Sequence, residues 1–230
     1  MSVTDNREEG EMSRVVIAKE ADIVTLGNLC LDIVLKDPSL PPPSLEERMA
    51  YMKELSASQP DKNYWEAGGN CNVAIAAARL GLHCLTLGLV GNEIYGHFLL
   101  DVLHDEGICT VGINEDADAV TSPSASYETR LCWVLVDPLQ RHGFCSRAEF
   151  FKEPAFVWLS KLSEEMKMAI KNSKILFCDG YGFDGFSPGL IVSALDYAME
   201  VGTSIFLILD LGGRLFIMEH LNSREHLTGY

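Results

Sequence analysis

The sequence predicts an α/β fold in which helices cover both faces of a mostly parallel sheet and a smaller β-sheet lies beside it. Three observations support this prediction. Apolar strand-like segments alternate with amphipathic segments, 47% of the 230 residues are hydrophobic, and one internal stretch is rich in strand-forming residues. Such alternation is typical of a parallel sheet between helical layers, and a chain of this size can bury a sizeable core.

The predicted strands and helices follow one another in a regular order along the chain. Strands are predicted where short apolar runs occur, over residues 22–27, 31–35, 84–90, 108–113, 175–178 and 204–209. Helices are predicted where apolar residues recur on one helical face, over residues 45–55, 73–80, 94–106, 163–172 and 189–201. Four prolines between residues 38 and 44 separate the second strand from the first helix, because proline interrupts regular structure.

Two segments of different composition predict the smaller sheet. Residues 124–136 mix β-branched, aromatic and apolar side chains, which favours a strand. A returning strand is predicted over residues 142–146, after the turn at Asp137-Pro138. The segment 124–146 is therefore expected to supply a small flanking sheet.

Composition excludes several classes of function. The net charge of −15 argues against binding to a nucleic-acid backbone, and no run of about 18 apolar residues predicts a membrane span. The seven cysteines form no C-x-x-C pair, which is typical of reduced thiols, so we expect a cytoplasmic location. Residues 1–20 are polar and acidic, and we expect a mobile tail followed by one domain over residues 21–230.

One helix carries His97, Asp101 and His104 on a common face. Because apolar residues lie roughly opposite, we expect these three side chains to face solvent. No other spacing of histidine, cysteine and carboxylate residues resembles a zinc site, so no metal site is predicted.

The first candidate binding residues are Asn28 and Asp32, which follow the first predicted strand. Ligands of open α/β sheets bind beyond the carboxyl ends of the strands, and an aspartate there can accept hydrogen bonds from two hydroxyl groups. The alternative interpretation is a turn-forming asparagine and a solvent-facing aspartate on an edge strand.

The second candidate is the run Ala-Gly-Gly-Asn-Cys-Asn-Val-Ala over residues 67–74. Gly68 and Gly69 allow backbone to approach a ligand closely, and Asn70 follows where an alanine-rich helix begins. The free N–H groups and the positive dipole end of that helix suit a polyhydroxylated or anionic ligand. Asparagine capping of the helix, with small residues for close packing, is the alternative.

Two further turns could contribute contacts. The segment 90–96 reads Val-Gly-Asn-Glu-Ile-Tyr-Gly, in which Asn92 is expected to cap the next helix and could contact a ligand. The last predicted strand is followed by Asp210-Leu-Gly-Gly-Arg214, a turn whose glycines could approach a phosphate. No Walker glycine motif occurs.

The run over residues 67–74, with its spacing to Gly81 and Gly91, resembles the first signature of the PfkB (ribokinase-like) carbohydrate kinases. The resemblance implies a ribokinase-like three-layer α/β/α sandwich with a small β-lid, and transfer of the ATP γ-phosphoryl group to a sugar or nucleoside hydroxyl, usually with Mg²⁺. It also implies that residues 31–66 and 124–146 supply the lid elements, and that homodimers pair through the lid. The residues it implies for holding the acceptor hydroxyls are Asn28, Asp32, Gly68, Gly69 and Asn70, with further contacts from Asn92, Asp210 and Arg214.

The second signature of that family, D-T-x-G-A-G-D, does not occur in these 230 residues. That signature supplies the family's anion hole and catalytic base, so no catalytic residue is predicted here. We therefore expect a fold that is incomplete at the C-terminus and a chain that holds the acceptor without phosphorylating it, with little nucleotide binding of its own. The alternative is a catalytically inactive sugar-binding or regulatory module.

Overall fold

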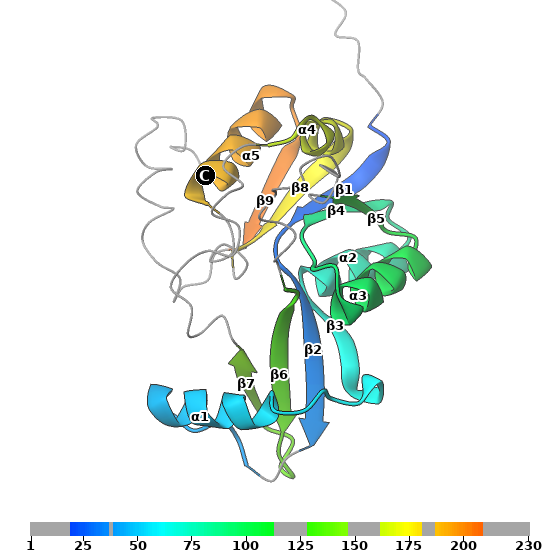
Figure 1. The fold of residues 1–230 in the computed structure, drawn as a ribbon. Helices are drawn as coiled ribbons and strands as arrows, with labels where there is room; N and C mark the ends of the chain where they lie inside the picture. Colours follow the sequence, from blue (N-terminus) through cyan, green and yellow to red (C-terminus); the bar gives the residue numbers. More distant parts are fainter. Residues whose placement is uncertain (1–18, 37–38, 113–127, 147–161, 181–186, 209–230) are drawn as a thin grey trace, which may run out of the picture.

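The computed structural model describes residues 19–36, 39–112, 128–146, 162–180 and 187–208. Its main layer is a five-stranded sheet in the order β5-β4-β1-β8-β9, with every neighbouring pair parallel (Figure 1). The strands are β1 (Ala21–Leu26), β4 (Cys84–Gly88), β5 (Cys109–Gly112), β8 (Ser173–Asp179) and β9 (Ser204–Ile208). The predicted parallel sheet is confirmed.

Helices cover both faces of this sheet, as the alternating pattern predicts. On one face, α4 (Glu164–Lys171) and α5 (Pro188–Glu200) bury Met166 and Leu195 against Val24 of β1. On the other face, α2 (Asn70–Arg79) and α3 (Ile94–Asp105) bury Ala74 and Leu103 in a second cluster that includes Ile23. The two clusters form because successive side chains of a strand point to opposite faces. The three-layer arrangement is thereby confirmed.

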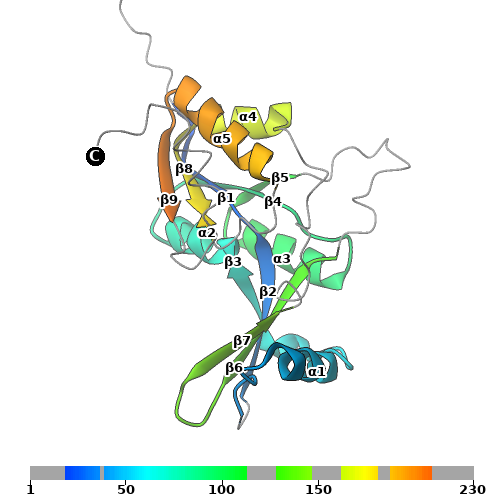
Figure 2. The ribbon, with the colours of Figure 1, turned by 90° about the vertical axis from the view of Figure 1, so that its left-hand side faces the viewer.

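A second, four-stranded sheet, here called the lid sheet, extends away from the main layer (Figure 2). Its order is β3-β2-β6-β7, where β2 pairs antiparallel with β3 and parallel with β6, and β6 pairs antiparallel with β7. The strands are β2 (Leu29–Lys36), β3 (Trp65–Gly69), β6 (Arg130–Val136) and β7 (His142–Ser146). One face buries Leu31, Ile33, Trp133 and Leu135, and the opposite face carries Asp32.

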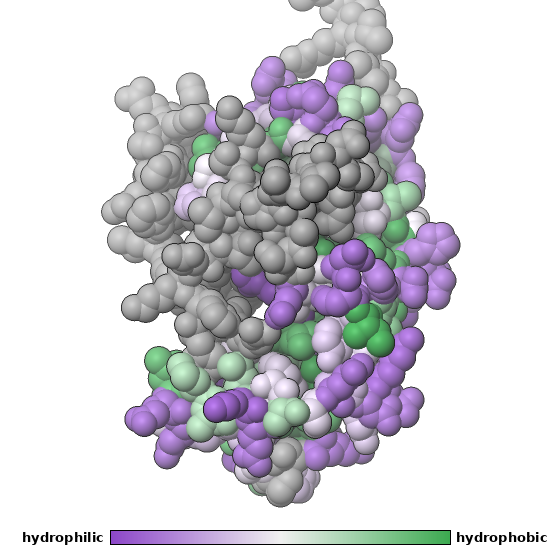
Figure 3. Space-filling view, in the orientation of Figure 1, coloured by the Kyte–Doolittle hydropathy of each residue, from purple (hydrophilic) through white to green (hydrophobic). Residues whose placement is uncertain are grey.

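Helix α1 (Leu45–Leu55) lies beside β7 and has no fully buried residue. It occupies the predicted residues, and the hydroxyl of Ser44 caps its first turn by accepting a hydrogen bond from the Glu47 backbone N–H. Its Leu45 and Met49 are exposed, so hydrophobic and hydrophilic side chains lie together over the lower part of the molecule (Figure 3). Within the described residues, no helix combines the length and apolar character needed to cross a lipid bilayer.

The sequence pattern does not predict strand β3, which is the main difference between the predicted and the observed elements. A segment that ends in two glycines has no strand-like composition, but pairing with β2 holds it extended. As a consequence α2 begins at Asn70, before the predicted start at residue 73. Strand β6 begins at Arg130, and residues 124–127 of the predicted strand lie outside the described residues.

The prediction that Asn92 caps α3 is wrong, because Glu93 is the capping residue. The Glu93 carboxylate accepts hydrogen bonds from the backbone N–H groups of Tyr95 and Gly96, and from that of Thr129 at 2.7 Å. Burial raises the pKa of this carboxyl, but the hydrogen bonds together lower it more, so the net pKa lies below its ordinary value. Glu93 thus ties the start of α3 to the residue before lid strand β6.

Gly96 permits this close contact, and its replacement gives a test of the arrangement. A Cβ added at Gly96 would lie 2.0 Å from the carbonyl oxygen of Gly91. We expect Gly96→Ala to lower the free energy of unfolding by about 1–3 kcal/mol, because overpacking outweighs the gain of up to about 1 kcal/mol from a helical alanine. Urea denaturation measures this. Gly189→Ala, at an exposed position of α5, is the control and should be neutral or stabilising. An unchanged stability of Gly96→Ala would contradict the packing described.

Candidate functional site

The site centres on the carboxylate of Asp32, which lies directly over Gly68. Strand β2 brings Asp32 beside β3, where Asp32 pairs with Glu66 and Cys30 pairs with Gly68. A Cβ added at Gly68 would lie 2.2 Å from both Cγ and Oδ1 of Asp32. Any side chain at position 68 would therefore displace the carboxylate, so glycine allows Asp32 its observed position.

The turn from β3 into α2 depends on the second glycine. Gly69 has φ 58° and ψ −133°, a conformation that residues with a side chain rarely adopt, and a Cβ there would lie 2.7 Å from the carbonyl oxygen of Asn28. The backbone N–H of Asn70 donates to the same Asn28 oxygen at 2.9 Å. No side chain caps α2, so asparagine capping of this helix, the alternative weighed for the motif, is not observed. The positive end of the α2 dipole therefore lies beside the glycine pair.

Asn70 lies beneath this turn and is completely buried. Its side-chain Nδ2 donates to the hydroxyls of Thr25 on β1, at 2.8 Å, and Thr86 on β4, at 3.3 Å. Thr25 Oγ1 in turn donates to Thr86 Oγ1 at 2.9 Å. Gly27 makes room for the amide, since a Cβ there would lie 2.8 Å from Asn70 Cγ. These contacts give Asn70 a positioning role, and direct contact between Asn70 and an acceptor stays a prediction.

Sequence reasoning missed Thr25 and Thr86. The available signal was a hydroxyl residue inside each of two otherwise apolar strands, and the structure places the two residues at paired positions of β1 and β4. Both are fully buried. Buried hydroxyl groups need hydrogen-bond partners, so two such residues in core strands indicate a polar side chain between them.

Burial dominates the electrostatics of the site. It raises the pKa of the Asp32 carboxyl above its ordinary value, while the Cys30 thiol, whose Sγ lies 3.5 Å from Oδ1, lowers it and nearby Glu66 raises it. Burial likewise raises the pKa of Cys30 well above its usual range and that of Cys71 to about 12. The thiols are therefore protonated and poorly nucleophilic, and the carboxylate is a partly desolvated hydrogen-bond acceptor.

The other predicted residues are distributed as follows. Asn28 is buried between β1 and β2, next to the glycine turn. Asn92 is exposed, and its Oδ1 lies 3.0 Å from His97 Nε2. Asp210 and Arg214 lie outside the described residues. As predicted, the helix face with His97, Asp101 and His104 is exposed.

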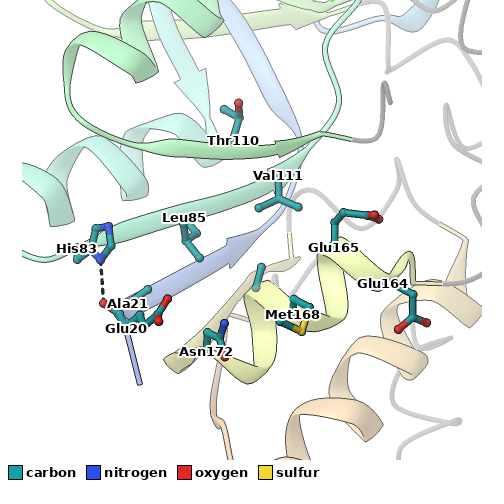
Figure 4. A pocket seen from close by; sticks show the side chains of 11 residues that line it. Glu20, Ala21, His83, Leu85, Thr110, Val111, Glu164, Glu165, Met168 and Asn172 are labelled. Atoms are coloured by element: carbon teal, nitrogen blue, oxygen red, sulfur yellow. Dashed lines mark hydrogen bonds between the residues drawn. The ribbon is translucent and has the colours of Figure 1, made fainter. Parts of the chain in front are cut away.

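A separate cavity of about 500 Å³ lies between α4 and the strands β4 and β5 (Figure 4). Leu85, Val111 and Met168 form its apolar wall, and His83 lies at its edge with Nδ1 2.8 Å from the Glu20 carbonyl oxygen. The cavity adjoins the first residue of β1, whereas Asp32 lies beyond the other end of this six-residue strand, which spans about 20 Å. Because ligands of open α/β sheets bind at the carboxyl ends of strands, Asp32 and not this cavity is the candidate site.

The sequence of the chain matches a known protein family. A model of the pfkB family carbohydrate kinases matches residues 21–202, which include the lid strand with Asp32 and the glycine turn. The chain belongs to this family. The matched residues make up most of the chain and include every strand of both sheets except β9.

Similar proteins include several sugar kinases. The 5-dehydro-2-deoxygluconokinase of Bacillus subtilis (strain 168) is 25% identical over 196 residues, which are 84% of this chain and 52% of that protein. The probable fructokinase-3 of Arabidopsis thaliana is 32% identical over 100 residues, which are 44% of this chain and 25% of that protein. The chain thus spans about half, or less, of the length of the curated relatives it matches.

Solved structures show the same fold. The fructokinase of Halothermothrix orenii has a TM-score of 0.57 at 19% identity, with 89% of this chain and 66% of that chain covered. The adenosine kinase of Schistosoma mansoni in complex with adenosine has a TM-score of 0.60 at 14% identity, with 90% of this chain and 59% of that chain covered. The ribokinase-like architecture is therefore shown.

The raised pKa of Asp32 has a consequence for stability. A carboxyl whose folded pKa lies above its ordinary value of 3.8 favours the folded state when protonated, so its contribution is lost as the pH rises through the raised value. We expect Asp32→Asn to raise the free energy of unfolding at pH 7 and to change it little near pH 3, as measured by urea denaturation.

Asp22→Asn is the matched control with the opposite sign. Its hydrogen bond from Lys174, at 2.7 Å, lowers the pKa of Asp22, so ionised Asp22 stabilises the fold above its ordinary value of 3.8. Asp22→Asn should therefore lower stability at pH 7. Destabilisation at pH 7 by both substitutions would contradict the account of Asp32 as a desolvated group kept for binding.

Proposed function

We propose that this chain forms the acceptor-binding part of a sugar kinase. The observation that carries the proposal is the Asp32 carboxylate held over Gly68, where the lid sheet meets the main layer. A carboxylate can accept hydrogen bonds from two neighbouring hydroxyl groups, which is what recognition of a sugar requires. Family membership, and the sugar kinases named among the relatives, support the same substrate class.

Each residue of the proposed site has a distinct task. Asp32 accepts hydroxyl hydrogens, and its partial desolvation strengthens those bonds relative to the same bonds in water. Gly68 leaves room for the carboxylate, Gly69 leaves the backbone open to close approach, and the α2 dipole favours the oxygen atoms of the acceptor. Asn28 supplies polar atoms at the turn, and Asn70 keeps the turn in place through Thr25 and Thr86.

The proposal separates acceptor binding from phosphoryl transfer. In this family ATP, usually with Mg²⁺, supplies the phosphoryl group, and alignment with charge neutralisation provides most of the catalysis. Within the described residues, no group of three or more histidine, cysteine or carboxylate side chains could hold a metal ion, so we assign no step to Mg²⁺. Asp210 and Arg214 remain candidate phosphate contacts, and D-T-x-G-A-G-D is absent from these 230 residues.

A second candidate, a catalytically inactive sugar-binding or regulatory module, is favoured by the absence of that signature. The two candidates differ in whether a nucleotide-binding part must complete the site. A kinase needs the nucleotide half of the active site from a longer product, whereas a binding module does not. Acceptor-dependent ATP consumption by the longer product, but not by this chain, is the result that distinguishes the kinase.

Calorimetric titration of sugars and nucleosides, including D-fructose, D-ribose and adenosine, tests the proposed site. At least one should bind saturably, and Asp32→Ala and Gly68→Ala should each weaken its binding about tenfold or more, because each removes the positioned carboxylate. The control is Asp101→Ala, on the exposed face of α3. Equal affinities of all four proteins, with circular dichroism confirming the fold of each, would contradict the proposed site.

A further inference from the structure

We propose that Arg130 selects an acceptor that carries a carboxylate, so that the proposed site takes a sugar acid rather than a neutral sugar. This inference rests on the proposed function and names the substrate class of the same site. Three observations carry it: the register of Arg130 in the lid sheet, the way its backbone is anchored, and the absence of a described partner for its guanidinium.

The strand register places Arg130 on the same face of the lid sheet as Asp32. Arg130 pairs with Cys30, and two residues further along Cys132 pairs with Asp32. Side chains of paired residues on neighbouring strands point to the same face. The contact between Cys30 Sγ and Asp32 Oδ1 shows that these two side chains share that face. Arg130 therefore lies on the acceptor side of the sheet, opposite the buried Trp133.

The preceding residue fixes the start of β6 at the junction of the two sheets. The Thr129 backbone N–H donates to Glu93 Oε1 at 2.7 Å, and Thr129 Oγ1 accepts from the Gly91 backbone N–H at 2.9 Å. Arg130 is thus held at the end of the lid strand nearest the main layer. Its diagonal neighbour on β2 is Asp32. With about 4.8 Å between strands and about 3.3 Å per residue, the two positions lie roughly 8 Å apart, within reach of a long side chain.

Among the described residues, the guanidinium of Arg130 has no partner that would compete with a ligand. The other described arginines have protein partners: Arg79 binds Glu106, Arg141 binds Asp137, and Arg48 donates to the Phe144 carbonyl oxygen. For the half-buried Arg130, the described part of the chain supplies neither a hydrogen-bond acceptor nor an ion-pair partner. Asp32 does not fill that role, since burial, not a cation, dominates its pKa and raises it. A partly desolvated cation without a partner gains from binding an anion.

The surrounding charges favour a carboxylate over a phosphate ester. A planar guanidinium matches a carboxylate through two parallel hydrogen bonds. The acceptor side of the lid also carries Asp32 and Glu66, so one arginine stands beside two carboxylates. The two carboxylates oppose any anion, but they repel a phosphate monoester, with nearly two charges, more strongly than a carboxylate with one.

Calorimetric titration with D-gluconate and D-glucitol tests the inference, because these probes differ only in a carboxylate replaced by a hydroxymethyl group. D-glucuronate with D-glucose forms a second pair, and D-fructose 6-phosphate tests a phosphate ester. We expect the acids to bind about ten- to a hundredfold more tightly than their neutral partners, with a preference that falls as salt rises. Arg130→Gln should abolish the preference and Arg130→Lys should keep part of it. Lys36→Gln, at the exposed far end of β2, should leave it unchanged.

Asp32→Asn separates failure of the inference from failure of the proposed function. If binding depends on Asp32 while Arg130→Gln leaves the preference for acids intact, only the inference is overturned. A wild-type preference for the neutral partner or the phosphate ester would also overturn it. If no probe binds saturably, or Asp32→Asn affects none of them in a folded protein, the proposed site itself is wrong.

Discussion

The arrangement depends on one buried interaction, the clamp that the side chain of Asn70 forms with Thr25 and Thr86. These threonines belong to the central strands β1 and β4, whereas Asn70 begins α2 immediately after lid strand β3. The Asn70 backbone N–H also binds Asn28, between β1 and β2. One residue thus joins the main layer, the helix and the lid sheet. Each of its hydrogen bonds contributes only about 1 kcal/mol, but breaking one would leave a buried polar group without a partner.

The clamp explains why glycines surround it. Gly27 leaves room for the amide, Gly69 adopts the backbone conformation that turns β3 into α2, and Gly68 leaves room for the carboxylate of Asp32. The three glycines therefore allow the close packing that holds the turn from β3 into α2 beside a partly desolvated carboxyl. Such a carboxyl costs stability when it is ionised, which is common where a protein keeps a group for binding rather than for folding.

The local sequence pattern predicted much of the fold but fewer of the residues that form the candidate site. Apolar periodicity predicted α1 at its observed residues and the other helices to within a few positions, because apolar residues recur at helical spacing in each of them. Strand β3 could not be predicted, since its extended backbone comes from pairing with β2 and not from its own residues. The cap of α3 by Glu93 depends on Thr129, which is distant in sequence. The glycines and Asp32 could be identified from a local motif. The roles of Thr25, Thr86 and Arg130 could not, because they depend on the register between strands that are distant in sequence.

The most direct test of the central claim, that the acceptor binds at the junction of the two sheets, is the location of a bound sugar. ¹H–¹⁵N correlation spectra of the labelled chain, recorded during titration with the acceptor that binds most tightly, report this residue by residue. The account predicts that the largest shift changes fall on the backbone amides of Asp32, Gly68 and Gly69. Changes confined to the cavity beside α4, at His83, Leu85 and Met168, would contradict it.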